Sequence, residues 1–517
     1  MYRYFSEIGK ELFMNNEIMA FICYFILMLG IGLYFYVKDR KTETETGSDD
    51  YFLGGRKMGP WVTAMSAQAS DMSAWLLMGL PGAIMAFGLG QAWIGVGLVI
   101  GTTLNWILVA KRLRKFSKAA GDSITLPQYL QNRFVTKNPT VTILCAVVFL
   151  ISFTIYVASG FVAGATVFTT LVPELPTDKA MIIFAVVILL YTFLGGFKAV
   201  CWTDFFQGFL MLFALIAVTI MMAVSGHADH AALSQVYTNV HDGTRYAFTS
   251  NMFNASWQEV VSGLTWGLGY FGMPHILVRF MSIEKPSMIK KSTVVALTWV
   301  VISLFCSIAI AYLGRMIFGA ELLPEGLQKT VFIVAGRKYF PSFLSGILMA
   351  AIIAASMSTA DSQLLVASSS FTEDIYKKVI RKDASEKELL WIGRLVVVIV
   401  SVVAYFIASS KGAGAQAIMD MVENAWGLFG AAFGPVVLLS LFWKRYNQQG
   451  AIAGIIAGAV VDIVWLKMFA ASTGLYELFP GFIAALAASV IVTLLTPAPS
   501  AEVERLFDYA TDPENDN

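Results

Sequence analysis

Apolar runs of about twenty residues, bounded by charged or turn-forming residues, recur along the whole 517-residue chain. A run of this length is enough to cross the hydrocarbon core of a bilayer as a helix. We therefore predict an all-α polytopic membrane protein with about thirteen transmembrane helices. The predicted spans are residues 18–38, 60–87, 91–110, 139–172, 180–197, 202–226, 255–278, 291–314, 341–370, 390–410, 418–443, 449–468 and 476–496.

Two of these spans contain residues that interrupt an apolar helix. The second span contains Asp71, Gly79 and the sequence LPGA at 80–83, and the seventh contains WGLGYFGMPH at 266–275. The two spans stand five helices apart, so a unit that starts at the seventh span enters the membrane from the opposite side. Discontinuous helices at matching positions of two inverted halves are typical of transporters, in which the breaks form a central binding site.

The same pattern predicts how the chain is divided. The expected parts are an extracellular N-terminal tail (1–17), a first helix with a cytoplasmic loop (18–59), an inverted-repeat transport core of helices 2–6 and 7–11 (60–443), two peripheral helices (444–497) and a cytoplasmic tail (498–517). The acidic end of that tail, from Asp508 to Asn517, has the composition of a disordered segment.

Composition and charge agree with a membrane protein. Hydrophobic residues make up 57% of the chain and charged residues only 14%, against about 25% in a soluble domain. An outside N-terminus and a cytoplasmic C-terminus place most of the 36 basic residues, Arg279 among them, on the cytoplasmic side. This orientation satisfies the positive-inside rule.

No enzyme motif accompanies the spans. The sequence lacks a Walker motif, a nucleophile elbow and a zinc motif, so we expect neither an enzyme nor an ATP-driven pump. The net charge of +1 is dispersed and gives no sign of a nucleic-acid partner. Nothing in the sequence indicates an obligate protein partner, and the lipid bilayer is the expected surrounding.

The stretch SAQASDMSAW at 66–75 places Asp71 among small residues inside an apolar span. A charge at mid-bilayer costs about 2.5–3.5 kcal/mol on insertion scales, so we expect Asp71 to face protein, water or a cation. An unwound helix frees backbone carbonyls, and a dehydrated cation needs several oxygen ligands. Helix packing is the alternative explanation for the serines, because small residues are common where helices approach closely.

The stretch AASMSTADSQ at 354–363 offers further oxygen ligands in the ninth span. Ser358 and Thr359 present adjacent hydroxyls, and Asp361 adds an intramembrane carboxylate. Because small side chains allow two helices to approach closely, carbonyls of one helix and hydroxyls of the other can share a cation.

Other polar and aromatic positions are open to two interpretations. Asp204 and Gln207 have the spacing of a helix N-cap and its reciprocal partner, but they also fit the exit path of a cation. Trp266 and Tyr270 lie beside the second break, which favours a pocket for a small solute over interfacial anchoring. The sequence assigns no role to three further carboxylates, which are Asp420, Glu423 and Asp462.

Several longer stretches resemble one family, the sodium/solute symporters, between about residue 18 and residue 505. They are DDYFLGGRKMGPWVTAMSAQASDMSAWLLMGLPGA, TLPQYLQNRF, YTFLGGFKAVCWTDFFQGFLM, WGLGYFGMPHILVRFM, MSTADSQLLVASSSFTEDIYKK and GAAFGPVVLLSLFW. The resemblance implies a leucine-transporter-like fold with a 5+5 inverted repeat in a bacterial cell membrane. It also implies alternating access, with sodium and L-proline moving together into the cell.

The resemblance further implies roles for individual residues. A sodium site of main-chain carbonyls and hydroxyls maps onto Ala69, Met72, Ala355, Ser358 and Thr359. Support of that site, or its coupling to transport, maps onto Asp71, Ser73 and Asp204, with Asp361 as an additional carboxylate. Solute binding maps onto Tyr156, Trp266, Tyr270 and Pro274, with Trp75 and Gly79 close by.

Three residues depart from the pattern of the family's proline carriers. Ala74 replaces a usual glycine, Met273 replaces a glutamine of one member, and Asp361 replaces a common serine. Met273 lies within the implied solute motif, so another amino acid, a betaine, pantothenate or a sugar acid is the alternative cargo. A transporter-like solute sensor is a further alternative, and the shortness of the C-terminal tail argues against it.

Overall fold

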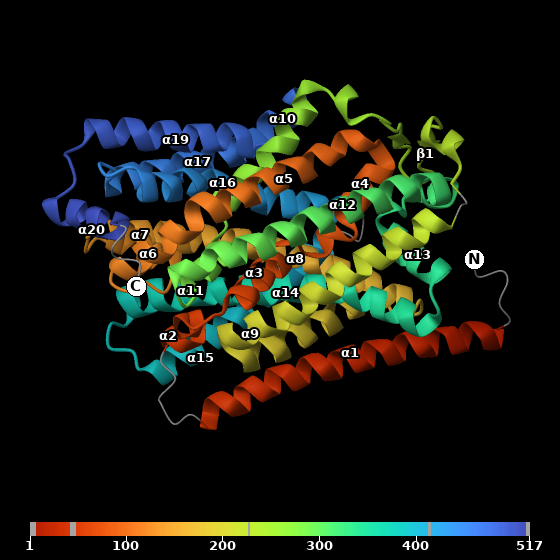
Figure 1. The fold of residues 1–517 in the computed structure, drawn as a ribbon, viewed down its shortest axis with the longest axis horizontal. Coiled ribbons are helices and arrows are strands. Elements are labelled where there is room, and N and C mark those ends of the chain that lie inside the picture. The colour runs from red at the N-terminus through yellow and green to blue at the C-terminus, as the bar shows by residue number, and fades with distance from the viewer. Residues whose placement is uncertain (1–6, 42–47, 226–227, 412–414, 513–517) are drawn as a thin grey trace.

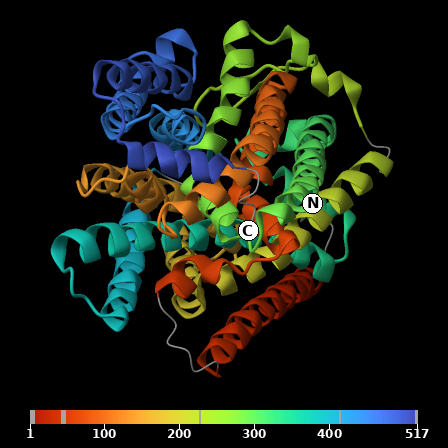
Figure 2. The same cartoon turned by 60° about the vertical axis from the view of Figure 1, so that its left-hand side comes forward.

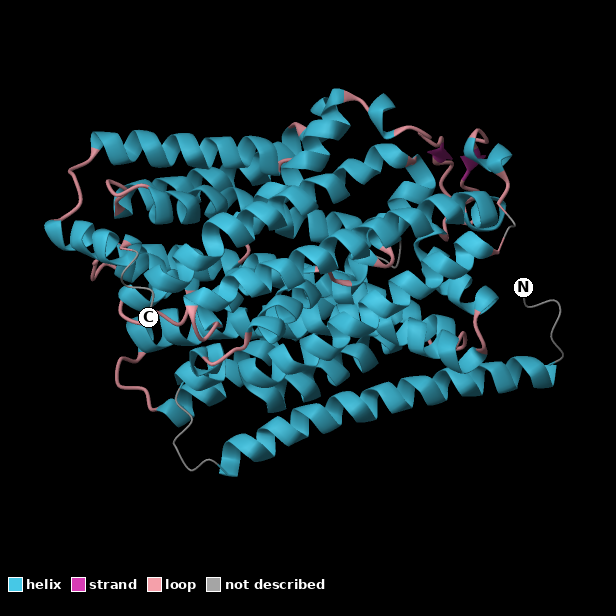
Figure 3. Ribbon diagram, in the orientation of Figure 1, coloured by secondary structure: helices cyan, strands magenta, loops and turns pink. Residues whose placement is uncertain are grey.

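Helices form nearly all of the regular structure in the computed structural model, which describes residues 7–41, 48–225, 228–411 and 415–512 (Figure 3). One small antiparallel sheet pairs β1 (Tyr237–Thr238) with β2 (Arg245–Tyr246). The α-helices are α1 (Glu7–Lys41), α2 (Ser48–Leu53), α3 (Pro60–Asp71), α4 (Gly79–Phe87), α5 (Ala92–Leu104), α6 (Lys111–Ala119), α7 (Leu126–Arg133), α8 (Thr140–Leu171), α9 (Thr177–Val224), α10 (Trp257–Thr265), α11 (Pro274–Ser282), α12 (Ile289–Leu322), α13 (Val331–Tyr339), α14 (Ser342–Ser369), α15 (Glu386–Lys411), α16 (Ala415–Phe442), α17 (Gln448–Met468), α18 (Ala470–Thr473), α19 (Leu478–Leu495) and α20 (Ala501–Thr511).

Within the described residues, ten helical segments are long and apolar enough to cross a membrane. Two of the other predicted spans, 60–87 and 255–278, are the interrupted ones, whose separate halves are shorter. A third, 180–197, is the first half of α9 and joins the next span across a kink at Gly196, where φ is +57°. The all-α polytopic architecture is confirmed, while the number of spans stays a prediction.

Both ends of the described chain carry more helix than the sequence predicts. The helix α1 begins at Glu7, well before the predicted start at residue 18. At the other end, α20 continues to Thr511, so the prediction that disorder begins at Asp508 is wrong. Phe507 of α20 packs edge-on against Phe116 of α6, with ring centroids 5.3 Å apart, and this burial stabilises the helix. Residues 513–517 of the predicted tail lie outside the described residues.

The two predicted interruptions are confirmed. α3 ends at Asp71, because Met72 leaves the helical region with ψ at 77°, and a short 3-10 turn at 74–76 precedes α4. α10 gives way to a 3-10 stretch at 266–271, and α11 begins at Pro274. Proline suits the first position of a helix because its missing N–H would have no intrahelical partner there.

A close contact between main chains holds the second interruption in place. A Cβ atom added to Gly101 of α5 would lie 2.2 Å from the carbonyl oxygen of Gly267, which belongs to the 3-10 stretch. No side chain fits between the two segments, so the glycines allow α5 to support the unwound backbone directly. Small residues at such contacts are the usual means of close helix approach in membranes.

The interrupted helices lie inside the bundle. In both ribbon views α1 runs along one edge and α17 and α19 lie along the opposite edge (Figures 1 and 2). Between them, α14 packs against α1, α3, α8 and α9. Large apolar side chains cover the outside of the bundle, among them Phe213 (62% exposed), Phe305 (67%) and Phe406 (65%). An apolar outer surface around a buried polar interior is the arrangement that a bilayer requires.

Candidate ion and solute site

The broken end of α3 meets α14 at Ser358. The last turn of a helix leaves main-chain carbonyls without intrahelical partners, and the Ser358 hydroxyl donates a hydrogen bond of 2.8 Å to the Ala69 carbonyl oxygen. The same hydroxyl lies 3.2 Å from the Ala355 carbonyl oxygen. Three oxygens from two helices therefore converge at one buried point, and all three belong to the sodium set predicted from the sequence.

The remaining two members of the predicted sodium set flank this point. Met72 is the first residue beyond α3 and has non-helical main-chain angles. Thr359 follows Ser358 along α14, and its buried hydroxyl has no hydrogen-bond partner among the described residues. A buried hydroxyl without a partner is costly unless a ligand uses it. This donor set of carbonyls and hydroxyls suits a small hard cation and offers no soft ligand.

Asp71 connects the two interrupted segments. Its carboxylate is buried, and Oδ2 accepts a hydrogen bond of 2.5 Å from the Tyr270 hydroxyl in the second break. The neighbouring Ser73 accepts a hydrogen bond of 3.2 Å from the main-chain N–H of Trp75 and so caps the turn that restarts the chain. Asp71 thus links the two breaks through its side chain, and Ser73 caps the turn beside the oxygen cluster.

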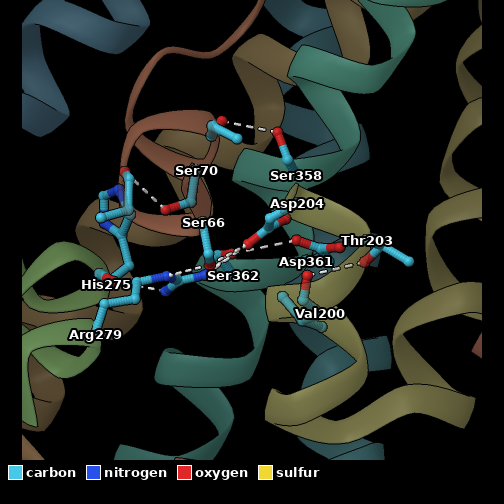
Figure 4. Close-up of polar contacts among 12 residues, drawn as sticks. Ser66, Ser70, Val200, Thr203, Asp204, His275, Arg279, Ser358, Asp361 and Ser362 are labelled. Carbon is cyan, nitrogen blue, oxygen red and sulfur yellow. Dashed lines mark hydrogen bonds and ion pairs between the residues drawn. The ribbon is translucent and has the colours of Figure 1, made fainter. Parts of the chain in front are cut away.

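A second buried polar cluster lies about one helical turn from the contact between Ala69 and Ser358, along both α3 and α14 (Figure 4). Arg279 of α11 forms an ion pair of 3.0 Å with Asp204 of α9, and Ser66 of α3 bridges the pair. The Ser66 hydroxyl donates to Asp204 Oδ2 at 2.7 Å, while Arg279 Nε donates to Ser66 Oγ at 3.0 Å. Arg279 also donates to Ser362 of α14. Four elements therefore share one charged contact.

The structure excludes the capping interpretation of Asp204 and Gln207, and the exit path of a cation stays a prediction. Both residues lie well inside α9, so they do not cap a helix. Asp204 binds Arg279, and the Gln207 amide donates to the Tyr24 hydroxyl of α1 at 2.9 Å. The sequence also predicts Arg279 as a cytoplasmic loop residue, which is wrong, because Arg279 is 1% exposed within α11.

Asp361 lies at the edge of this cluster. The Ser362 hydroxyl donates to its Oδ1 at 3.3 Å, and its Oδ2 is buried without a hydrogen-bond partner among the described residues. Asp204 Oδ1 is likewise buried and without a partner there. Two buried carboxylates thus face one guanidinium, and an excess negative charge in this environment attracts a cation or a proton.

The residues predicted to bind solute lie along an aromatic wall beside Asp71. The indole rings of Trp75 and Trp266 stack with centroids 5.4 Å apart, one from each interruption. Gly79 lies against Trp75, because a Cβ atom there would be 2.8 Å from the Trp75 ring. Tyr270 is hydrogen-bonded to Asp71, as described above, so four of the predicted residues lie together.

The other two predicted residues lie on the α8 and α11 side of the wall. Tyr156 of α8 contacts His275 edge-on at 6.4 Å between centroids, and Pro274 precedes His275 at the start of α11. Sequence reasoning missed Trp426 of α16, whose indole N–H donates to the Trp266 carbonyl oxygen at 2.8 Å and whose ring meets Tyr270 at 5.1 Å. The only sequence signal for Trp426 is an aromatic residue in a glycine-rich span.

Comparison with known proteins agrees with this geometry. Residues 51–458 match the model of the Sodium:solute symporter family. The chain belongs to this family. The symporter is therefore a transporter and not an enzyme, and sodium is the ion that it co-transports with a small-molecule substrate.

The symporter is similar over nearly its whole length to proteins of known function. It is 41% identical to the sodium/proline symporter of Haemophilus influenzae over 492 residues, which cover 94% of this chain and 95% of that protein. It is 42% identical to the high-affinity proline transporter PutP of Bacillus subtilis over 489 residues, which cover 93% and 99% of the two chains.

Solved structures show the same fold. A sodium-coupled sialic acid symporter in a substrate-bound outward-open state superposes with a TM-score of 0.74 at 20% identity, over 94% of this chain and 99% of that chain. The nucleobase-cation-symport-1 family transporter Mhp1 in a closed conformation gives a TM-score of 0.51 at 14% identity, over 89% and 98%. The predicted leucine-transporter-like fold is confirmed.

Proposed function

We propose that this symporter carries L-proline into the cell together with sodium by alternating access. The observation that carries the proposal is the junction of Ala69 and Ser358, where freed carbonyls of a broken helix meet the hydroxyls of a neighbouring one. The identity of about two residues in five with proline carriers supports proline as the cargo.

The sodium ion is bound by the Ala69, Met72 and Ala355 carbonyls and by the Ser358 and Thr359 hydroxyls. In the structure the Ser358 hydroxyl donates to the Ala69 carbonyl; when sodium binds, the hydroxyl keeps its proton but turns it away, and both oxygens contact the ion. Sodium therefore ties α3 to α14. Asp71 and Ser73 hold the main chain of the break in the conformation that aims the carbonyls at the ion.

Proline binds in the space bounded by Trp75, Gly79, Tyr156, Trp266, Tyr270 and Pro274. Indole and phenol rings provide the apolar surface for a pyrrolidine ring, and the main-chain groups freed at the two breaks pair with its charged ends. Because Ala69, Met72 and Trp75 belong to the same interruption, the position of α3 is common to both sites. Coupling follows if both ligands favour the same conformation of that segment.

The cytoplasmic half of the pathway contains Asp204 and Asp361. Both have an unpartnered oxygen among the described residues, and Asp361 lies within one turn of Ser358 on α14. A sodium ion that leaves the site toward the cytoplasm passes these carboxylates. The N-terminus lies outside and the C-terminus in the cytoplasm of a bacterial cell. Sodium that moves inward down the membrane potential releases about 2.3 kcal/mol per charge for each 100 mV.

Uptake into proteoliposomes tests the proposal. Purified symporter is reconstituted with an inward sodium gradient, and the accumulation of labelled L-proline is compared with that under an equal potassium gradient. We expect accumulation only with sodium. Uptake that proceeds equally with potassium would refute sodium coupling, and sodium-driven uptake that unlabelled proline fails to inhibit would refute the cargo.

A competition panel distinguishes the remaining cargoes. Unlabelled glycine betaine, pantothenate, a sugar acid and other amino acids are each added in excess to the sodium-driven assay. We expect proline to inhibit at the lowest concentration, because the aromatic wall offers mostly apolar surface, which fits a pyrrolidine ring better than a polyol.

A further inference from the structure

An acidic cavity lies beside the solute wall, at the ends of α4, α10, α16 and α17. It has a volume of about 610 Å³, and both Trp266 and Tyr476 line it. Four carboxylates line it as well, and among the described residues at its surface there is no lysine, arginine or histidine; the four are Glu259, Asp420, Glu423 and Glu477. A cleft lined by a single sign of charge raises the local concentration of counter-ions.

Glu477, which lines this cavity, lies near a second buried carboxylate, Asp462, which is not part of the lining. Glu477 is 3% exposed and Asp462 of α17 is 1% exposed. A Cβ atom added to Gly427 would lie 3.0 Å from Asp462 Oδ1 and 3.4 Å from Glu477 Cγ, so the two side chains converge over that glycine. Asp462 Oδ1 and Glu477 Oε1 are both buried with no hydrogen-bond partner among the described residues.

Two adjacent buried carboxylates with unpartnered oxygens are unfavourable by themselves. Burial removes the water that would solvate them, and their charges repel each other more strongly at low dielectric. No basic side chain of the cavity surface compensates them. Rings of Asp and Glu in comparable positions are the usual means by which a membrane protein selects cations.

The arrangement points to a monovalent ion. Within the described part of the chain, no three His, Cys, Asp or Glu side chains converge in the manner of a divalent metal site. A monovalent cation needs fewer charged ligands than a divalent one, and two carboxylate oxygens together with water from the open cavity are enough to bind it. Asp462 and Glu477 belong to α17 and to the segment before α19, so this pair is distinct from the junction of α3 and α14.

We propose that the cleft at Glu477, with Asp462 beside it over Gly427, is a second, outer binding site for a sodium ion. This proposal rests on the proposed function in two respects. The proposed function gives the side of the membrane that the cavity faces, and it gives sodium as the coupled ion. Trp266 stacks on Tyr476 with centroids 5.4 Å apart, so an ion in this cleft lies beside the wall that closes the solute site. Its occupancy is expected to accompany solute entry.

Thermal stability of the purified full-length chain tests this site. The background is Ser358→Ala with Thr359→Ala, which removes the hydroxyls of the junction site. Sodium chloride replaces choline chloride at constant ionic strength, and the melting temperature is followed. A ligand that binds the folded state alone raises the melting temperature in a saturable way. We expect such a rise with sodium in this background, and its loss when Asp462→Asn and Glu477→Gln are added.

Asp242→Asn is the matched control. Asp242 is an exposed acid of the loop between β1 and β2, and its Oδ1 accepts a hydrogen bond of 2.8 Å from the Thr244 N–H. Its replacement removes one carboxylate, as each of the two test substitutions does, without touching the cavity, so the sodium-dependent shift should persist. A shift that survives Asp462→Asn with Glu477→Gln, or a background that responds equally to sodium and choline, overturns the outer site.

The two proposals fail in different ways. Sodium-driven proline uptake by the unaltered chain, together with no sodium-dependent shift in the background, removes the outer site and leaves the proposed function intact. A sodium-dependent shift that requires Asp462 and Glu477, in a protein that does not take up proline, supports the outer site and removes the proposed function. If the doubly substituted chain does not fold, Asp462→Asn and Glu477→Gln are tested one at a time in the background, and a sodium-dependent shift that neither reduces overturns the outer site.

Discussion

The hydroxyl of Ser358 lies 2.8 Å from the main-chain oxygen of Ala69, across the junction between α14 and the broken end of α3. These two atoms come from segments almost three hundred residues apart in sequence, and they meet only because α3 stops at Asp71. An ion bound at this junction would therefore depend directly on where the interrupted helix α3 ends.

Loss of the junction hydroxyls should weaken sodium binding. We expect Ser358→Ala and Thr359→Ala each to raise the half-saturating sodium concentration for proline uptake by at least about tenfold, since a lost ligand to a charged group is worth about 1.5–3 kcal/mol. The KM for proline at saturating sodium should change far less. Ser369→Ala is the control, because this α14 hydroxyl only bonds back to the Val366 carbonyl at 2.9 Å. Equal sodium dependence in all three variants would place the ion elsewhere.

The buried ion pair should contribute strongly to stability. Asp204→Asn leaves the Arg279 guanidinium without its carboxylate inside the bundle, and breaking a buried pair in this way costs about 3–5 kcal/mol. We expect a clear drop in melting temperature in detergent. Adding Arg279→Gln should recover part of it, because the uncompensated charge is then gone, and a double-mutant cycle measures the coupling.

An acid on the same helix provides the control for that experiment. Asp178 is exposed in the first turn of α9, where a negative charge gains only about 0.3–1 kcal/mol from the helix dipole. Asp178→Asn should therefore leave the melting temperature nearly unchanged. A double variant no more stable than Asp204→Asn would show that the pair is not coupled as the structure indicates.

Removal of the hydroxyl that joins the two interruptions should impair proline transport. Tyr270→Phe deletes the donor to Asp71, and a buried acceptor left without its partner costs about 1–3 kcal/mol. We expect kcat/KM for proline to fall by at least about tenfold, measured as initial uptake at saturating sodium. Tyr405→Phe on α15 removes the same kind of hydroxyl from a ring that packs against Phe406, and it should have no such effect. Normal proline uptake by Tyr270→Phe would exclude this contact from the transport cycle.

The sequence predicts the interruptions well because their cause is local. Asp71, the following glycines and Pro274 lie close together in sequence at the two breaks, so the combination can be recognised locally, although single residues of these types, such as Pro435 in α16, also lie inside continuous helices. Arg279 shows the opposite case. A lone arginine near the end of a span has the pattern of a cytoplasmic flank, and only the packing of α11 against α3, with α9 and α14 close by, shows that it is buried against Asp204.

The spacing of Asp204 and Gln207 also shows what local patterns leave undecided. A capping box and an interior polar pair share the same residue types at the same separation, and they differ only in whether a helix begins there. α9 runs through both residues, so their partners come from α11 and α1. The roles of Trp426 and Asp462 depend in the same way on which helices are neighbours, which no single sequence pattern states.

The close contact between Gly101 and Gly267 should make position 101 intolerant of any side chain. A methyl group on Gly101 would lie 2.2 Å from the Gly267 carbonyl oxygen and 2.4 Å from its Cα, and both are main-chain atoms that have no rotamer through which to move away. Gly101→Ala should therefore displace the 3-10 stretch that carries Trp266 and Tyr270, at a cost of about 1–3 kcal/mol. We expect a lower melting temperature and a higher KM for proline, while the half-saturating sodium concentration stays close to that of the unaltered chain.

Gly30→Ala on α1 is the control, because a Cβ atom there meets nothing within 4 Å and alanine favours the helix by about 1 kcal/mol. If Gly101→Ala behaves like Gly30→Ala, the second interruption does not depend on support from α5.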